Sequence, residues 1–150
     1  MADRVIEELD EDQCLNLISG GGIGRIAYAS RFGPAVLPVN YALQDGAVVF
    51  RTAADGPLDE DLRTGITDAD YKVAFEIDSI DLATRQGWSV LVQGPAHHVT
   101  GTGQDAVRRA GIESWAPGPR ELFVRIVPSR ITGRRVGLAR QGRLSQANGT

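Results

Sequence analysis

The sequence has a single cysteine and no apolar run long enough to cross a bilayer. One thiol, Cys14, cannot form a disulfide within the chain, which fits a protein of a reducing cytosol. The segment Met1–Glu8 lacks the apolar core of a signal peptide, and a spanning helix needs about 20 consecutive apolar residues. We therefore expect a cytoplasmic protein with no membrane segment.

Metal clusters and familiar catalytic motifs are also missing. His97 and His98 are adjacent on an expected strand, so their side chains face opposite sides and cannot both bind one ion; one is expected in solvent and one packed. Cys14 lies on the apolar face of an expected helix, where it acts as a small hydrophobic residue. The glycine-rich residues 20–24 follow a helix and precede a strand, whereas a dinucleotide-binding loop needs the reverse order.

The composition is that of an ordinary globular domain, and its charge is unevenly placed. The 150 residues are 42% hydrophobic and 23% charged, which fits one domain with a sizeable core. The net charge of −3 argues against general nucleic-acid binding, which would rest only on the arginines near the C-terminus. Nine of the nineteen acids fall between Asp55 and Asp81, and no acid follows Glu121.

The pattern of apolar residues predicts a leading helix followed mainly by strands. Asp10 or Asp12 can cap the helix, and Ser19–Gly22 ends it. Six strands are expected, at residues 23–29, 35–43, 47–52, 71–78, 88–100 and 122–136, with a bulge or bend at Gly94–Pro95 and an interruption near Pro128. Short helices are expected at 57–64 and 105–110. Tight turns such as Asp45–Gly46 make the sheet mainly antiparallel, in a barrel or a sandwich.

Polar residues inside these apolar strands are the candidate site. Counted back from the Asp45–Gly46 turn, Asn40 and Arg51 should lie close to each other. The Arg51 guanidinium and the Thr52 hydroxyl can grip a phosphate, and the Asn40 amide can bind the edge of a heterocycle. Tyr41 is either a hydrogen-bond donor to a ligand or a buried hydroxyl bonded to backbone. Trp88 offers a flat surface to an aromatic ring.

Several segments, in order, resemble the pyridoxamine 5'-phosphate oxidase-like FMN-binding split-barrel family, in particular its short actinobacterial group. The segments are Gly24–Ala27, Pro38–Tyr41, Phe50–Thr52, Val73–Asp78, Gly87–Gly94 and Ile131–Arg135. The resemblance implies a mainly β protein, a six-stranded antiparallel split β-barrel over residues 1–136, followed by a flexible basic tail over 137–150. It also implies a homodimer with the cofactor groove at the subunit interface.

Carried over position by position, the resemblance also implies the cofactor-binding residues. Arg51 and Thr52 would meet the FMN phosphate and ribityl chain, and Val39, Asn40 and Tyr41 would lie along the isoalloxazine. Trp88 and Ser89 would flank the site, and Arg134 would meet the partner chain or the phosphate. One departure is Gly56–Asp61, where acids stand at positions in which relatives carry a lysine, and these acids oppose a phosphate.

The resemblance implies a flavin-dependent oxidoreductase that uses FMN and acts on a small planar substrate. No residue is identified as catalytic acid or base. A deazaflavin-dependent reductase is an alternative, with Arg134, Arg135 and Arg140 at the groove mouth. A second alternative is a non-catalytic module that binds a flavin or a tetrapyrrole, which the acidic Gly56–Asp61 segment favours.

Overall fold

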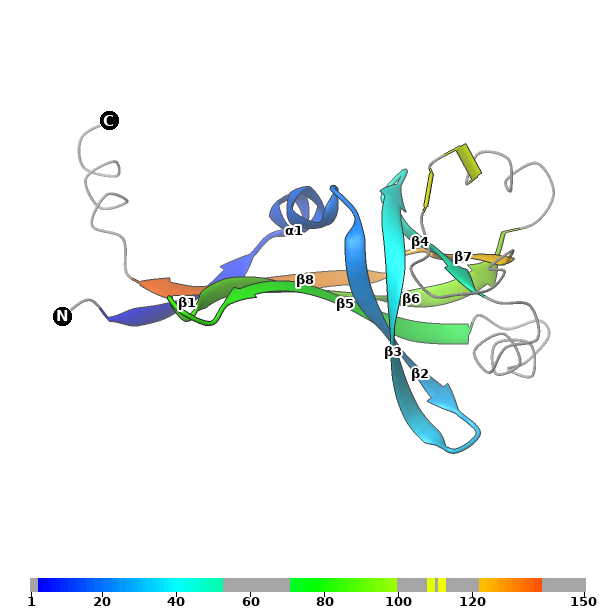
Figure 1. Cartoon of the computed structure of the whole chain (residues 1–150), viewed down its shortest axis with the longest axis horizontal. Coiled ribbons are helices and arrows are strands. Elements are labelled where there is room, and N and C mark those ends of the chain that lie inside the picture. The colour runs from blue at the N-terminus through cyan, green and yellow to red at the C-terminus, as the bar shows by residue number, and fades with distance from the viewer. Residues whose placement is uncertain (1–2, 53–70, 100–107, 110, 113–121, 139–150) are drawn as a thin grey trace.

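The computed structural model describes residues 3–52, 71–99, 108–109, 111–112 and 122–138, and this part of the chain is almost entirely β-strand (Figure 1). Its elements are β1 (Arg4–Leu9), α1 (Glu11–Ile18), β2 (Gly22–Ser30), β3 (Gly33–Gln44), β4 (Ala47–Thr52), β5 (Tyr71–Asp81), β6 (Gln86–His98), β7 (Leu122–Ile126) and β8 (Arg130–Leu138). The fold is therefore mainly β, as predicted.

Six of the strands close into an antiparallel barrel. Neighbours in the sheet run β6, β5, β2, β3, β4 and β7, and β7 pairs with β6 to complete the ring. The β3–β4 hairpin turns at Asp45 and Gly46, whose φ angles of 51° and 78° are both left-handed, as this two-residue turn requires. The predicted hairpin and the predicted six-stranded antiparallel barrel are both confirmed.

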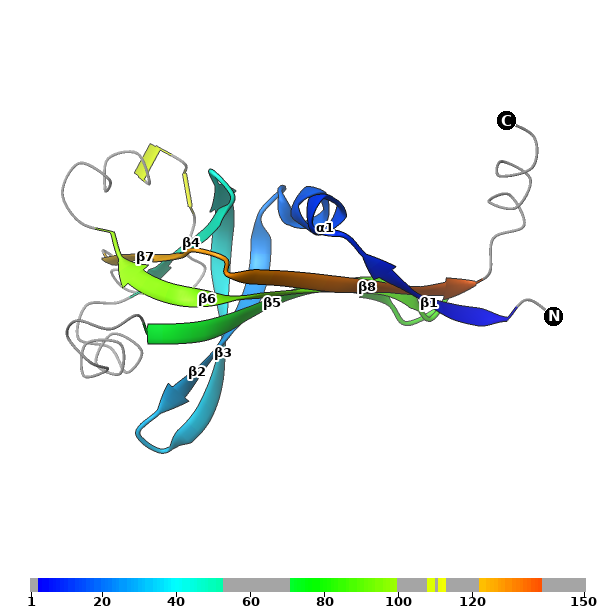
Figure 2. The same cartoon turned by 180° about the vertical axis from the view of Figure 1, so that it is seen from behind.

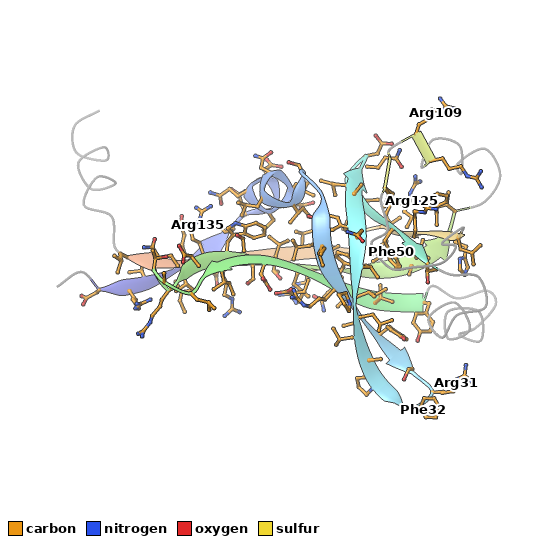
Figure 3. The ribbon with its side chains drawn as sticks, in the orientation of Figure 1. Arg31, Phe32, Phe50, Arg109, Arg125 and Arg135 are labelled. Atoms are coloured by element: carbon orange, nitrogen blue, oxygen red, sulfur yellow. The ribbon has the colours of Figure 1, made fainter. Side chains whose placement is uncertain are left out.

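The barrel interior is filled by alternate residues of the strands. Val73, Phe75 and Ile77 of β5 are buried, as their period of two predicts. The rings of Tyr41 and Phe50 pack on Phe75, with centroids 5.4 Å and 6.0 Å away. Figure 3 shows Phe50 among the barrel strands. The residues between these on β5 therefore face outward, away from the barrel core.

Strand β6 is long enough to pair with two successive strands. Its first part pairs with β8 as far as Gln93, opposite Arg130, and its last part pairs with β7 from Ala96, opposite Ile126. The chain passes from β7 to β8 through Pro128, where an interruption was predicted. A methyl group added to Gly94 would stand 2.1 Å from the carbonyl oxygen of Val127, so glycine permits this close crossing.

Of the bulge or bend predicted at Gly94–Pro95, a bulge in the β5–β6 ladder is wrong. Pairing of β5 with β6 is unbroken from Tyr71 opposite Ala96 to Asp81 opposite Gln86. The irregularity lies instead on the other neighbour of β6, at the β7–β8 junction. β6 runs unbroken through Gly94 and Pro95, and the interruption lies opposite them, between Ile126 and Arg130.

Strands β8 and β1, with the parts of β5 and β6 beside them, form an arm that projects from the barrel. Figures 1 and 2 show this arm on the side of the molecule opposite β4 and β7. β1 was not predicted from the sequence. It is an edge strand paired only with β8, and charged residues alternate poorly with apolar ones along it. β8 continues to Leu138, two residues into the range expected for the tail.

Helix α1 lies on one face of the arm. Asp10 caps it as predicted, because its Oδ1 accepts the Gln13 N–H at 2.8 Å and the Gln13 side chain accepts the Asp10 N–H at 2.9 Å. Cys14 is fully buried, and its Sγ would be 2.6 Å from a methyl group placed on Gly133 of β8. Gly133 therefore lets the helix approach the arm closely.

Some predictions fall on residues that the structure does not describe. The expected helix at 57–64, the acidic Gly56–Asp61 segment and the tail from residue 139 lie outside the described residues. Of the expected helix at 105–110, Arg108 and Arg109 are described and are helical. No helix in the described part of the chain is both long and apolar enough to cross a membrane.

Candidate functional site

Alternation along the strands divides the eight predicted cofactor residues between two faces. Four face the barrel core or the side of the arm that α1 covers: Val39, Tyr41, Thr52 and Trp88. Four face outward: Asn40, Arg51, Ser89 and Arg134. Side chains on opposite faces of a strand cannot contact one small ligand together, so the outward set is the stronger candidate site within one chain.

The structure brings Ser89 and Arg134 together on the outer face of the arm. Ser89 stands directly opposite Arg134 in the β6–β8 ladder and opposite Asp78 in the β5–β6 ladder. They line a groove of about 660 Å³, called here the outer groove. Its lining residues are Ile6, Glu8, Leu9, Glu76, Ser89, Leu91, Arg130, Thr132, Gly133 and Arg134. The outer groove thus combines two arginines, two hydroxyls, two carboxylates and an apolar floor.

A second groove adjoins the outer groove towards the end of the arm. This arm-end groove of about 390 Å³ shares Ser89 and Arg134 with it, and adds an apolar wall from Ile80 and Leu82. Leu82 and Ile80 are 87% and 61% exposed, respectively. Trp88 borders the arm-end groove next to Ser89, although alternation along β6 turns its side chain toward the face that α1 covers.

Arg135 lies on the opposite face from Arg134, as successive strand residues must. It stands opposite Trp88 and Glu7 and lines a separate groove of about 340 Å³ on the α1 side. Figure 3 shows Arg135 close to α1. The two neighbouring arginines consequently serve different grooves.

Asn40 and Arg51 lie on the barrel, away from the arm. The β3–β4 ladder ends at Tyr41 opposite Phe50, one pair short of the predicted contact between Asn40 and Arg51. Asn40 stands opposite Ile23 of β2. Arg51 donates a hydrogen bond from Nη1 to the Ile112 carbonyl oxygen at 3.2 Å, and its guanidinium lies 5.6 Å from the centre of the Phe123 ring.

Both Asn40 and Arg51 are half-buried. Because β4 and β7 lie at the far end of the molecule from the arm, one chain does not bring Arg51 into the outer groove with Arg134 (Figure 2). The predicted site is therefore split into a barrel part and an arm part.

Tyr41 is a core residue with a buried hydroxyl. Its side chain is 4% exposed, and its hydroxyl donates to the Ile18 carbonyl oxygen at 2.9 Å. Burial raises the pKa of Tyr41 to about 12, because the phenolate would lose its hydration. The geometry matches the second of the two roles considered for this residue, a hydroxyl bonded to backbone.

Sequence reasoning missed three ionisable side chains on the outer face, Arg25, Glu76 and Asp78. Arg25 of β2 stands opposite Glu76 of β5, and its Nη1 is 3.6 Å from both Glu76 Oε1 and Asp78 Oδ2. Burial and the neighbouring Asp78 raise the pKa of Glu76 to about 7, against the lowering effect of Arg25. The period of two in β5 placed both acids on the wet face, and this was the available signal.

The two histidines follow the prediction. His97 is exposed and His98 is half-buried on β6. Within the described ranges no three histidine, cysteine or acidic side chains gather where a metal ion could be held.

Comparisons with known proteins cover nearly the whole chain. A family model described as pyridoxamine 5'-phosphate oxidase matches residues 10–135. The Mycobacterium tuberculosis protein Rv0080 is 33% identical over 133 residues, which are 89% of this chain and 87% of that protein. An FAD-binding protein from Mycobacterium smegmatis has a similar structure, with 30% identity, a TM-score of 0.67 and coverage of 85% of this chain and 96% of the other.

A candidate pyridoxamine 5'-phosphate oxidase from Corynebacterium glutamicum also has a similar structure. Its structure is 26% identical, with a TM-score of 0.70, and the match covers 93% of this chain and 100% of that chain. The family-model match over residues 10–135 takes in the barrel and the part of the arm that carries Ser89 and Arg134.

Proposed function

The chain belongs to the pyridoxamine 5'-phosphate oxidase family, and from this premise we propose that it binds a flavin in the outer groove and uses it as an oxidoreductase. The observation that carries the proposal is the direct pairing of Ser89 with Arg134 in a groove beside an apolar wall. FMN is the proposed cofactor. The M. smegmatis relative is described as FAD-binding, so FAD is the second candidate.

The residues of the two adjoining grooves fit the parts of a flavin. Volumes of about 660 Å³ and 390 Å³ are in the range of small-molecule sites. Arg130 and Arg134 can bind a phosphate through charge-assisted hydrogen bonds. The hydroxyls of Ser89 and Thr132 can bond a polyhydroxyl chain, and the apolar wall of the arm-end groove can hold a flat ring.

A second copy of the chain is proposed to complete the site. The barrel part of the predicted site, Asn40 and Arg51, does not reach the outer groove of its own chain, and we propose that the same residues of a second copy supply it. The outer face also exposes large apolar side chains that a soluble monomer seldom leaves uncovered. Ile6 is 66% exposed and Val36 is 59% exposed, and both point outward with Ser89 and Asn40.

The bound flavin would supply hydride and electron transfer. The chain supplies binding and orientation. Arg134 neutralises the phosphate, Ser89 fixes the position of the ligand, and Ile80 and Leu82 exclude water from one face of the ring. The other ring face is left for a small planar substrate.

A deazaflavin coenzyme and a role without turnover are the competing proposals. The deazaflavin hypothesis placed Arg134, Arg135 and Arg140 together at the mouth of the groove. Arg134 and Arg135, however, face opposite sides of β8, and Arg140 is outside the described residues. Binding of a deazaflavin, with its more anionic tail, would fall more steeply with salt than binding of FMN. Failure of a reduced nicotinamide to bleach the bound flavin would favour a binding module.

Substitution of Arg134 tests where the flavin binds. In Arg134→Gln, loss of a charge-assisted hydrogen bond to phosphate should weaken FMN binding about 10- to 100-fold, which corresponds to about 1.4–2.8 kcal/mol. The measurement is titration of the flavin-free protein by fluorescence quenching. The matched control is Arg109→Gln, an exposed arginine that Figure 3 places far from the arm. Equal affinities in the two variants would contradict the proposed site.

A further inference from the structure

The outer groove contains a partly buried carboxylate, Glu76 of β5. Glu76 Oε1 is buried and has no hydrogen-bond partner among the described residues. The nearest cation, Arg25 Nη1, is 3.6 Å away, beyond hydrogen-bonding distance, and is equally far from Asp78. A buried oxygen without a partner is costly for an ionised carboxylate, while the Glu76 side chain as a whole is 37% exposed and lines the outer groove, where a ligand can reach it.

Charges of both signs surround Glu76. Arg25 faces it from β2 and Asp78 lies two residues along β5. Arg130 and Arg134 of β8 and Glu8 of β1 line the same groove, while β6 contributes only Ser89 and Leu91 there. One guanidinium at 3.6 Å thus serves two carboxylates. A proton on Glu76 relieves the repulsion between them.

We propose that Glu76 is a ligand-binding residue of the outer groove, and that it binds the flavin in its neutral acid form. The inference rests on the proposed function, because it takes the flavin to be in this groove. In the neutral acid the O–H donates to Asp78, and the other oxygen remains an acceptor that suits the N–H group of an isoalloxazine. An ionised Glu76 would instead add a second negative charge beside Asp78 and oppose an anionic cofactor.

The neutral form is available at physiological pH. Burial, together with the hydrogen bond and charge of Asp78, raises the pKa of Glu76 to about 7. If only the neutral form binds, the apparent affinity follows its population. That population falls about tenfold from about pH 6 to about pH 8, and binding should weaken by the same factor.

The test is the pH dependence of FMN binding to the full-length, flavin-free protein, compared with Glu76→Gln. The amide keeps the shape and the donor of the neutral acid but cannot ionise. The FMN phosphate itself titrates near pH 6, and this affects both proteins alike, so it cancels in the ratio of their affinities. Wild type should weaken about tenfold more than Glu76→Gln between about pH 6 and about pH 8. Asp12→Asn, an exposed acid on α1, should behave as wild type.

A second measurement needs no variant. The side-chain carboxyl carbon of Glu76, followed by NMR, should titrate at a higher pH in the FMN complex than in the free protein, because a ligand that prefers the neutral form raises the pKa by linkage. The same pKa with and without FMN, or the same pH dependence in wild type and Glu76→Gln, would overturn the inference and leave the proposed function standing. No flavin binding by any variant at either pH would overturn both.

Discussion

At the scale of single residues, Tyr41 and Ile18 join the barrel to the end of α1 by one buried hydrogen bond of 2.9 Å. The phenol must be neutral to donate it. In an unfolded chain tyrosine ionises near pH 10, whereas burial raises the pKa of Tyr41 in the fold to about 12. The unfolded state therefore releases its proton first, and stability should be lost between those two values.

Tyr41→Phe tests this assignment. At neutral pH the variant should lose about 1 kcal/mol of unfolding free energy, the usual net value of one hydrogen bond. Between about pH 10 and about pH 12 the wild type should lose up to about 3 kcal/mol more than the variant, because phenylalanine cannot ionise. Urea unfolding monitored by circular dichroism measures both effects. An equal alkaline loss in the two proteins would show that Tyr41 is not the responsible group.

Prediction of single residues from the sequence depended on contacts that are local. The capping role of Asp10 and the burial of Cys14 follow from neighbouring residues, and the structure confirms both. The grouping of Arg25 with Glu76 could not be predicted from residue types. It depends on the register of β2 against β5, two strands that are separated in the sequence by β3 and β4.

At the scale of elements, the β7–β8 junction depends on Gly94. The Val127 carbonyl oxygen would stand 2.1 Å from a methyl group at this position, and the Ser129 N–H donates to the Gln93 carbonyl oxygen at 2.8 Å just beside it. The backbone of this junction cannot move aside as a flexible side chain can. An alanine would therefore separate β6 from the junction.

Gly94→Ala should cost about 2–3 kcal/mol of unfolding free energy, the range of overpacking in a tight site. Gly20→Ala is the matched control, since a methyl group there meets nothing within 4 Å. The control should change stability by less than about 1 kcal/mol. Denaturant unfolding of both variants gives the comparison, and similar stabilities would mean that the crossing is not tight in solution.

Elements with strong alternation or clear turn residues were predicted well. The Asp45–Gly46 hairpin and the wet and dry faces of β5 are examples. β1 was missed because its strand conformation depends on pairing with β8. Its two adjacent glutamates also break the alternation of apolar and polar residues that would indicate a strand. The strand predicted at 122–136 proved to be two strands that pair with different parts of β6.

At the scale of the whole molecule, the split of the predicted site between barrel and arm is the main argument for a second copy. The closed barrel and the projecting arm set Arg51 and Arg134 apart in one chain (Figure 1). Sequence resemblance predicted the barrel and the set of polar residues. It could not predict this separation, because the arm is formed by the pairing of β8 with both β1 and β6.

Neighbouring residues of β1 provide a test of the dimer. Ile6 is on the outer face and lines the outer groove, whereas Val5 is on the opposite face. Ile6→Asp should bury a carboxylate in the subunit interface and weaken dimerisation at least about tenfold. Val5→Asp should leave it nearly unchanged. Light scattering across a concentration series measures both, and a wild-type protein that is monomeric throughout would contradict the proposal.

The visible absorption spectrum of the freshly purified protein, with mass spectrometry of the compound released on denaturation, tests the proposed flavin cofactor most directly. We predict a yellow protein that releases FMN; release of FAD would keep the flavin site and change the cofactor. A colourless protein whose spectrum and fluorescence do not respond to added FMN or FAD would contradict the account.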